Sequence, residues 1–323
     1  MNDIVFARGE NLPRRSFLRL ASAGLSAACM HPSVIASQPN APTRFQIACM
    51  TLPYNQFPLK RALQGIKSAG FNYVAWGTTH RESDSEKNVP VMPADGTTDQ
   101  AKSLANRCRD MGLEPSMMFS MVYPEHADGP KVLTQRLKQA GAAGIPQVLT
   151  FGHTQGGNRK LWVERLKQLG PIARDLGVLL VVKQHGGETG TGAACAEITR
   201  EVNDAGVKVN YDAGNVMDYL NVDPIPDILK CADEVRSLCM KDHRNWPKDE
   251  DCAPGLGEID HYRLMDAVAF TGLTMPLCLE NISSPLLPKP TAPEQIDQQA
   301  RWARLFLETV LGGLHSPTRF GVK

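Results

Sequence analysis

The sequence lacks long apolar runs and basic clusters. No stretch of 18 uncharged apolar residues occurs, so no integral membrane span is predicted. The 35 Lys and Arg residues nearly balance the 34 Asp and Glu residues and form no basic block, which argues against nucleic acid as a partner. An apolar fraction of 42% is sufficient for a large core. We therefore expect a globular fold.

Cysteines are also few, and their spacing suggests no pairing. The chain has eight, and none of them forms a Cys-x-x-Cys pair. Removal of Cys29 with the N-terminal segment discussed next would leave an odd number. This pattern provides neither a disulfide framework nor a zinc finger. Cys49 and Cys278 lie within apolar segments and are expected to be small core residues.

The first 36 residues are expected to be a targeting segment outside the fold. Residues 13–19 (PRRSFLR) resemble the twin-arginine export motif, and an uncharged stretch follows from Leu20 to Ala28. Small residues at 34–36 suit cleavage by signal peptidase. These features predict export to the periplasm by the twin-arginine pathway.

This interpretation divides the chain into residues 1–36 as the export signal, 37–43 as a linker, and 44–323 as a single catalytic domain. Residues 26–29 (SAAC) form a poor lipobox, so a soluble product is favoured over a lipoprotein.

From residue 45 onwards, short apolar strands alternate with amphipathic helices. Strands are predicted at 45–50, 71–76, 115–120, 147–151, 178–185, 208–212, 235–241 and 276–280. Helices are predicted at 58–69, 98–111, 129–142, 159–176, 192–205, after Pro224, and at 293–311, and long loops at 78–96 and 242–259.

This alternation predicts an α/β protein whose parallel strands close into a (β/α)8 TIM barrel. Several predicted helices end on a glycine followed by an apolar residue, as at Gly112-Leu113 and Gly177-Val178. Such a glycine permits a left-handed helix cap before the next strand. A doubly wound open sheet is the alternative, but no Gly-rich phosphate fingerprint follows the first strand.

The last four predicted strands end on charged or polar residues. These are Lys183 and His185, Asp212 and Asn215, Lys241 and Asp242, and Glu280 and Asn281. Barrels of this type build their sites at the carboxyl ends of the strands, and charge buried there is unfavourable unless it is paired or used. We therefore expect an enzyme, with a purely structural network of two amines and two acids as the alternative.

Alternation along the strands predicts which side chains point into the barrel. The inward set is Val181, Lys183 and His185, then Asn210 and Asp212, Cys239 and Lys241, and Cys278 and Glu280. The outward set, expected to contact the helices, is Val182, Tyr211, Met240 and Leu279. The charged residues are thus expected to share one cavity.

Four short motifs occur in order near the predicted strand ends. They are 211–215 (YDAGN), 240–242 (MKD), 254–260 (PGLGEID) and 279–281 (LEN). Together they resemble the xylose isomerase-like barrel superfamily, the sugar phosphate isomerases and epimerases, over about residues 44–312.

The resemblance implies one divalent metal held by Glu, Asp, His and Glu on strands five to eight. Asp212 and Glu280 match this pattern, but Lys183 and Cys239 occupy the other two positions. A hard cation prefers oxygen ligands, and a protonated Lys repels it. Mn, Mg, Co or Zn could persist on Asp212 and Glu280 with help from His185. Alternatively, Lys183 could replace the metal, or a softer metal could recruit Cys239.

The chemistry that the resemblance implies is proton abstraction next to a sugar carbonyl, through an enediolate. Glu280 is the candidate base, and Lys183, Lys241 or a metal is the candidate electrophile. Asp212 would be a ligand or an acid. Candidate substrate-binding residues are His185, Asn215, His153, Trp76, Trp246 and His243. A core position is an equal alternative for Trp76.

Other functions stay open on the sequence alone. The same enolate would serve a keto-sugar lyase or hydratase. A lysine with a lowered pKa would allow a Schiff-base lyase, and loss of the metal ligands would allow a non-catalytic sugar-binding protein. In each case the expected partner is a small carbohydrate, and a homo-oligomer is left open.

Overall fold

The computed structural model describes residues 41–316, apart from residue 78 and residues 84–86. The proposed export signal and most of the proposed linker lie outside the described residues. None of the helices in the described part has the length and apolar composition needed to span a bilayer.

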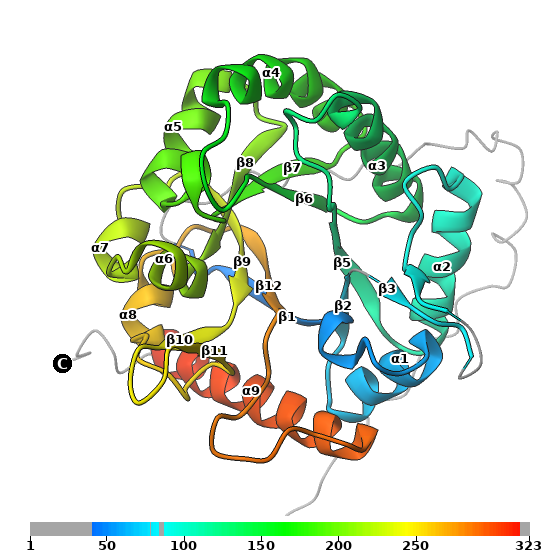
Figure 1. The fold of residues 1–323 in the computed structure, drawn as a ribbon, viewed down its shortest axis with the longest axis vertical. Helices are drawn as coiled ribbons and strands as arrows, with labels where there is room; N and C mark the ends of the chain where they lie inside the picture. Colours follow the sequence, from blue (N-terminus) through cyan, green and yellow to red (C-terminus); the bar gives the residue numbers. More distant parts are fainter. Residues whose placement is uncertain (1–40, 78, 84–86, 317–323) are drawn as a thin grey trace, which may run out of the picture. The chain divides into compact units, whose positions relative to one another are not determined.

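Eight parallel strands close into a barrel, as the sequence predicts (Figure 1). They are β1 (Arg44–Met50), β2 (Tyr73–Trp76), β5 (Glu114–Phe119), β6 (Gln147–Phe151), β7 (Leu179–Lys183), β8 (Val207–Asp212), β9 (Val235–Met240) and β12 (Thr274–Leu279). Each strand pairs with its neighbour in the chain among these eight, and β12 closes the barrel by pairing with β1.

Helices surround the barrel strands (Figure 1). They are α1 (Leu59–Ser68), α2 (Thr98–Asp110), α3 (Gly129–Ala143), α4 (Arg159–Asp175), α5 (Gly192–Val202), α6 (Ala213–Leu220), α7 (Pro224–Ile228), α8 (His261–Asp266) and α9 (Pro293–Leu314). Short 3-10 turns lie at η1 (Leu52–Tyr54) and η2 (Gly187–Thr189). The sequence did not predict α6, which begins directly after β8.

The apolar core has two layers, because side chains on a strand alternate between its two faces. Most of the buried apolar residues lie between the strands and the helices, and this layer includes Val182, Tyr211, Met240 and Leu279. A smaller cluster fills the barrel interior and includes Val181, Cys239 and Cys278. The predicted inward and outward faces of the last four strands are therefore confirmed for these residues.

Two short hairpins lie within the predicted loops. β3 (Thr79–His80) pairs with β4 (Val89–Pro90), and β10 (Asp242–Arg244) pairs with β11 (Glu250–Cys252). The second hairpin follows β9 directly, so the segment after this barrel strand is regular structure and not the long loop that was predicted. Antiparallel pairing instead brings the acidic segment of β11 back to the barrel mouth.

Candidate active site

Lys183 joins two carboxylates at the carboxyl end of the barrel. Its Nζ lies 2.7 Å from Oε2 of Glu280 and 3.1 Å from Oδ2 of Asp212. The Lys183 side chain is only 3% exposed, and Asp212 is fully buried. Lys183 and Asp212 end β7 and β8, and Glu280 directly follows β12, so three separate segments of the chain supply one buried ionic cluster.

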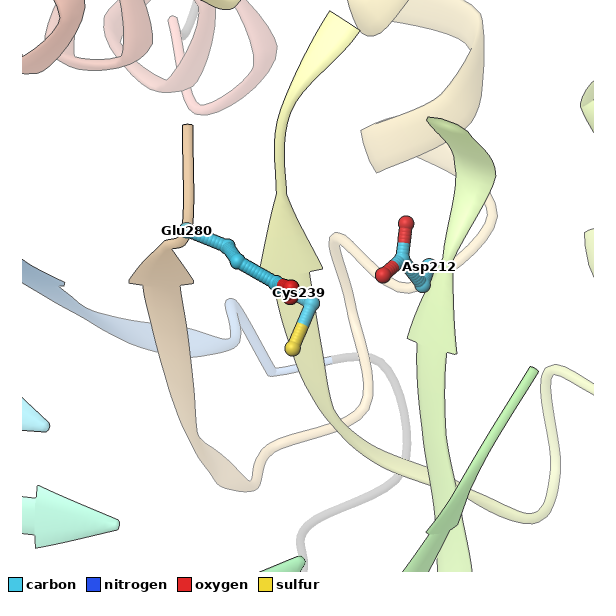
Figure 2. Close-up of side chains that lie close together, drawn as sticks. All are labelled: Asp212, Cys239 and Glu280. Atoms are coloured by element: carbon cyan, nitrogen blue, oxygen red, sulfur yellow. The ribbon is translucent and has the colours of Figure 1, made fainter. Parts of the chain in front are cut away.

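Strand register explains why these side chains meet. Asp212 pairs with Cys239, and Cys239 pairs with Cys278, two residues before Glu280. Figure 2 shows Asp212, Cys239 and Glu280 close together at the ends of neighbouring strands. The rings of Phe119 and Phe151 each lie with their centroids 5.9 Å from the Lys183 Nζ. The ammonium therefore has acids on one side and aromatic faces on others.

Burial and ion pairing act in opposite directions on the Glu280 carboxyl. Burial alone would raise its pKa, but the charges of Lys183 and Lys241 outweigh that effect and lower the pKa to about 2. For Asp212, burial dominates and raises the pKa, although Lys241 and Lys183 oppose the shift. Glu280 is therefore ionised at neutral pH, and Asp212 is the more easily protonated acid.

Burial also disfavours the charged form of Lys183, but Glu280 and Asp212 more than compensate. The pKa of Lys183 is raised well above its ordinary value. A lysine nucleophile needs a neutral amine. The pairing therefore disfavours a Schiff-base mechanism at this residue.

Lys241 contributes a second ammonium through a different partner. Its Nζ lies 2.6 Å from Oδ2 of Asp251 on β11. Burial lowers its pKa, but the charges of Asp212 and Glu280 dominate, and the pKa is raised overall. The side chain of Lys241 packs directly against Gly214. A Cβ at this position would lie only 2.6 Å from the Lys241 Cγ. This close approach explains the glycine of the motif at 211–215.

Asp212 also shapes the backbone around the cluster. It is the N-cap of α6, and its Oδ1 accepts a hydrogen bond from the Asn215 amide at 3.0 Å. Gln184 accepts a hydrogen bond from the Asp212 amide at 2.7 Å, and the Asn215 side chain donates to the Gln184 carbonyl. The structure thus places Asn215, a predicted substrate-binding residue, in a buried scaffold under Asp212.

The two motifs after β9 are connected by Asp242. Its carboxylate accepts hydrogen bonds from the amides of Gly255, Ile259 and His243, at 2.9 to 3.0 Å. Buried charged groups need such partners. The backbone of the motif at 254–260 is therefore held by the aspartate of the motif at 240–242. We assign both motifs a structural role at the rim of the barrel.

Glu280 is the member of the cluster that reaches an open cleft. Its side chain is 19% exposed and lines a cavity of about 470 Å³, together with η1 and the chain leading into α9. This volume lies within the range of small-molecule sites. A ligand in the cleft would lie next to Glu280, the residue whose carboxylate is paired with Lys183.

The side chain of His185 contacts aromatic rings and the backbone. β7 ends at Lys183, two residues earlier than predicted, and the chain turns away through Gly186 at φ +78°. The His185 ring contacts Phe151 and Tyr219, with its Nδ1 3.0 Å from the Gly152 carbonyl oxygen. The structure therefore does not bring His185 to Asp212 and Glu280 as a metal ligand.

His153 lies at the end of β6. It stacks on Tyr123 with ring centroids 3.9 Å apart, and its Nε2 lies 3.3 Å from a Glu125 carboxylate oxygen. Trp76 takes the core position that the sequence left open, because Ala75 has the inward face of β2 and Trp76 is buried against the helices. Trp246 is 81% exposed, between β10 and β11. His243 is fully buried on β10 and binds Asp251.

The residues present do not fit the divalent metal that the resemblance implies. Asp212, Cys239 and Glu280 each place one potential ligand atom within 4.8 Å of the others. However, the Lys183 ammonium lies between the two carboxylates and competes for the same oxygen atoms. Burial raises the pKa of Cys239 far above the ordinary value, although Lys183 opposes the shift, so burial disfavours the thiolate form that binds metals.

Sequence reasoning missed Asp251, Gln184 and Tyr219. Asp251 lies in a segment predicted as a loop, and only the hairpin register brings it to Lys241. Gln184 is next to Lys183, but its side chain accepts a hydrogen bond from the backbone of another strand, at Asp212. A sequence signal existed for Asp251 alone, in the run of acids at 249–251.

The fold and site define a family. The model of the xylose isomerase-like TIM barrel matches residues 63–306, and the chain belongs to that family. No curated protein matches the chain.

Solved structures share the fold at low sequence identity. An L-ribulose 3-epimerase is 15% identical, with a TM-score of 0.61 over 83% of this chain and 95% of that one. A xylose isomerase-like barrel protein from Mycobacterium smegmatis, in complex with magnesium, is 16% identical, with a TM-score of 0.63 over 82% and 97%.

A third similar structure is much longer than this chain. A xylose isomerase-like TIM barrel/4-hydroxyphenylpyruvate dioxygenase fusion protein is 19% identical, with a TM-score of 0.61. The match covers 82% of this chain but only 43% of the fusion protein.

Proposed function

We propose that this protein is a sugar isomerase or epimerase that abstracts a proton next to a sugar carbonyl. The observation that carries the proposal is the buried ammonium of Lys183 between Asp212 and Glu280, next to an open cleft. Proton abstraction at carbon needs a base and an electrophile within reach of one substrate. Family membership and the similarity in fold to an L-ribulose 3-epimerase support this class of reaction.

Glu280 is the proposed base because it is ionised and faces the cleft. In the free protein, Lys183 holds its carboxylate and makes it a weak base. A substrate carbonyl oxygen that accepts a hydrogen bond from Lys183 would draw the ammonium away from Glu280. The carboxylate would then gain basicity at the point where the proton on the neighbouring carbon must leave.

Lys183 and Lys241 are proposed to stabilise the enediolate. Removal of the proton places negative charge on the former carbonyl oxygen, and fixed cations in a water-poor site stabilise such charge strongly. Asp212 is the proposed acid that returns a proton, because burial raises its pKa. No step in this scheme requires a metal, because Lys183 provides the positive charge.

A keto-sugar lyase is the second candidate, and it rests on the same enediolate. The proposed base, cations and acid would serve either outcome. The difference lies in the substrate, because elimination needs a leaving group on the carbon next to the carbanion.

Deuterium exchange tests the proposal directly. The purified protein would be incubated in D2O with L-ribulose and a panel of other ketopentoses and ketohexoses, and followed by proton NMR. Loss of the signal from the proton next to the carbonyl, with formation of an isomer or epimer, is the expected result. We expect E280Q and K183M each to slow exchange by about 10²–10⁴-fold.

Glu197 offers a matched control for E280Q, because it is exposed on α5, away from the mouth. E197Q should exchange at the wild-type rate. An elimination product instead of an isomer would identify the lyase. Binding of a ketose without any deuterium uptake would refute catalysis and identify a binding protein.

We also propose that the enzyme acts in the periplasm, on the strength of the twin-arginine-like segment at residues 13–19. Cell fractionation of the full chain and of R14K/R15K would test export. The wild type is expected in the periplasm and the double variant in the cytoplasm. Equal distribution of both would refute the targeting proposal.

A further inference from the structure

A second group of potential metal ligands lies on the rim of the barrel. Asp218 on α6, His243 on β10 and Asp249 in the turn before β11 each place one ligand atom within 4.8 Å of the others. None of them belongs to the cluster around Lys183. The carboxylates are exposed, whereas His243 is completely buried.

Hydrogen bonding fixes the direction of the His243 lone pair. Its Nδ1 lies 3.0 Å from Oδ1 of Asp251. A carboxylate only accepts hydrogen bonds, so Nδ1 carries the proton. In the neutral ring, Nε2 then holds an unprotonated lone pair, and this buried atom has no hydrogen-bond partner. Orphaned atoms of this kind are rare and call for an explanation.

The Nε2 atom faces carboxylate oxygens. Oδ1 of Asp249 lies 3.3 Å away, without the geometry of a hydrogen bond. A lone pair beside a carboxylate is repulsive unless a positive charge lies between them. Either a proton on Nε2 or a bound cation would remove the repulsion.

The distances suit a metal ion. Zinc binds His nitrogen and carboxylate oxygen at about 2.0–2.2 Å, so two ligands of a tetrahedral centre lie roughly 3.3–3.5 Å apart. The 3.3 Å between His243 and Asp249 matches this spacing. Asp218 is exposed, and one of its carboxylate oxygens already lies within 4.8 Å of the ligand atoms of the other two residues.

The surrounding groups match the usual second layer of a zinc site. A metal-bound His commonly donates its other N–H to a carboxylate, which fixes the ring and strengthens it as a ligand. Asp251 has this position behind His243, and Lys241 holds Asp251 in turn at 2.6 Å. Four carboxylates in this region (Asp218, Asp249, Glu250 and Asp251) stand against three cations (Lys241, Arg244 and Lys248), and Arg244 and Lys248 both pair with Glu250. The balance leaves negative charge for a bound cation to offset.

We propose that Asp218, His243 and Asp249 form a binding site for a divalent transition metal of the zinc type, with water completing its coordination. The site would join α6 to the hairpin of β10 and β11. Because Asp251 contacts both His243 and Lys241, the metal would also order the second ammonium of the barrel mouth. This inference does not depend on the proposed sugar chemistry.

Calorimetric titration of the chelator-treated full-length protein with Zn²⁺ is the test. We expect one zinc ion per chain, with a dissociation constant of about 1 μM or tighter. D249N and D218N should each weaken binding by at least about tenfold. Both substitutions are at exposed side chains, so circular dichroism should show unchanged folding. Absorption spectra with Co²⁺ should lack a sulfur-to-metal charge-transfer band.

Two control variants locate the ion. C239S removes the thiol of the barrel cluster and should leave zinc binding unchanged. D99N removes an exposed carboxylate on α2 and should also bind normally. The proposal is overturned if the wild type does not bind zinc, if D249N and D218N bind as tightly as the wild type, or if C239S abolishes binding.

Discussion

Replacing Lys183 with methionine would test the ionic cluster most directly. Methionine fills a similar volume but carries no charge. Asp212 and Glu280 would then lose the ammonium that lies 3.1 and 2.7 Å away. Removing one partner of a buried ion pair leaves an uncompensated charge, which costs about 3–5 kcal/mol of stability.

The lowered pKa of Glu280 gives a second figure for the contribution of the ion pair to folding stability, and it is of similar size. Pairing lowers this pKa from 4.5 to about 2. At 1.36 kcal/mol for each tenfold change in proton affinity, this corresponds to about 3 kcal/mol. A lowered acid pKa stabilises the fold above the unfolded value of 4.5, and that contribution is lost as the pH falls towards 2.

The variant should show the opposite trend with pH. Without Lys183, burial would raise the pKa values of Asp212 and Glu280, so the folded state would bind more protons than the unfolded state. Stability of K183M would therefore increase on acidification. Urea unfolding at about pH 7 and about pH 5 should show a difference from the wild type that shrinks at the lower pH.

Two controls complete this experiment. K131M removes an exposed lysine on α3 and should change stability by less than about 0.5 kcal/mol. The triple variant K183M/D212N/E280Q removes the whole charged cluster and should recover much of the loss. A K183M protein as stable as the wild type at neutral pH, or a loss independent of pH, would refute the reasoning.

Three further substitutions probe the mouth of the barrel. K183E, in a D249N background, should create an Mn²⁺ site with Asp212 and Glu280, because three carboxylates would then face only the ammonium of Lys241. Metal analysis that finds no manganese would contradict this. G214A should displace Lys241 and cost about 1–3 kcal/mol by overpacking, whereas unchanged urea unfolding would show that the lysine has room. D242N should cost about 1–3 kcal/mol and speed amide hydrogen exchange at Gly255 and Ile259. Unaltered exchange at these amides would mean that the loop keeps its conformation without the Asp242 carboxylate.

Much of the fold could be predicted because strands and helices leave local periodic patterns. Alternation placed Val181 and Cys239 inside the barrel and Tyr211 and Met240 outside it, and the structure agrees. The rule does not extend to His185, because β7 ends two residues earlier than predicted and strand alternation ends with it.

The site was only partly predictable. Polar residues at strand ends indicated Lys183, Asp212 and Glu280, since closure of the barrel must bring strand ends together. For Trp76 the sequence left a sugar-stacking role and a core position equally open, and the structure buries it in the core. Asp251 was missed because its contact with Lys241 depends on the pairing of β10 with β11.

The sequence alone determined the order of strands and helices, the closed parallel barrel and the end of the barrel that carries the charge. These follow from hydrophobic periodicity, which acts over a few residues. The tertiary structure alone decided which charges pair. Lys183 sits between two acids where a metal would otherwise bind, and Asp251 reaches both Lys241 and His243. These partners are distant in sequence or joined by a hairpin, and ionic contacts depend on distances of a few ångströms that only the folded chain sets.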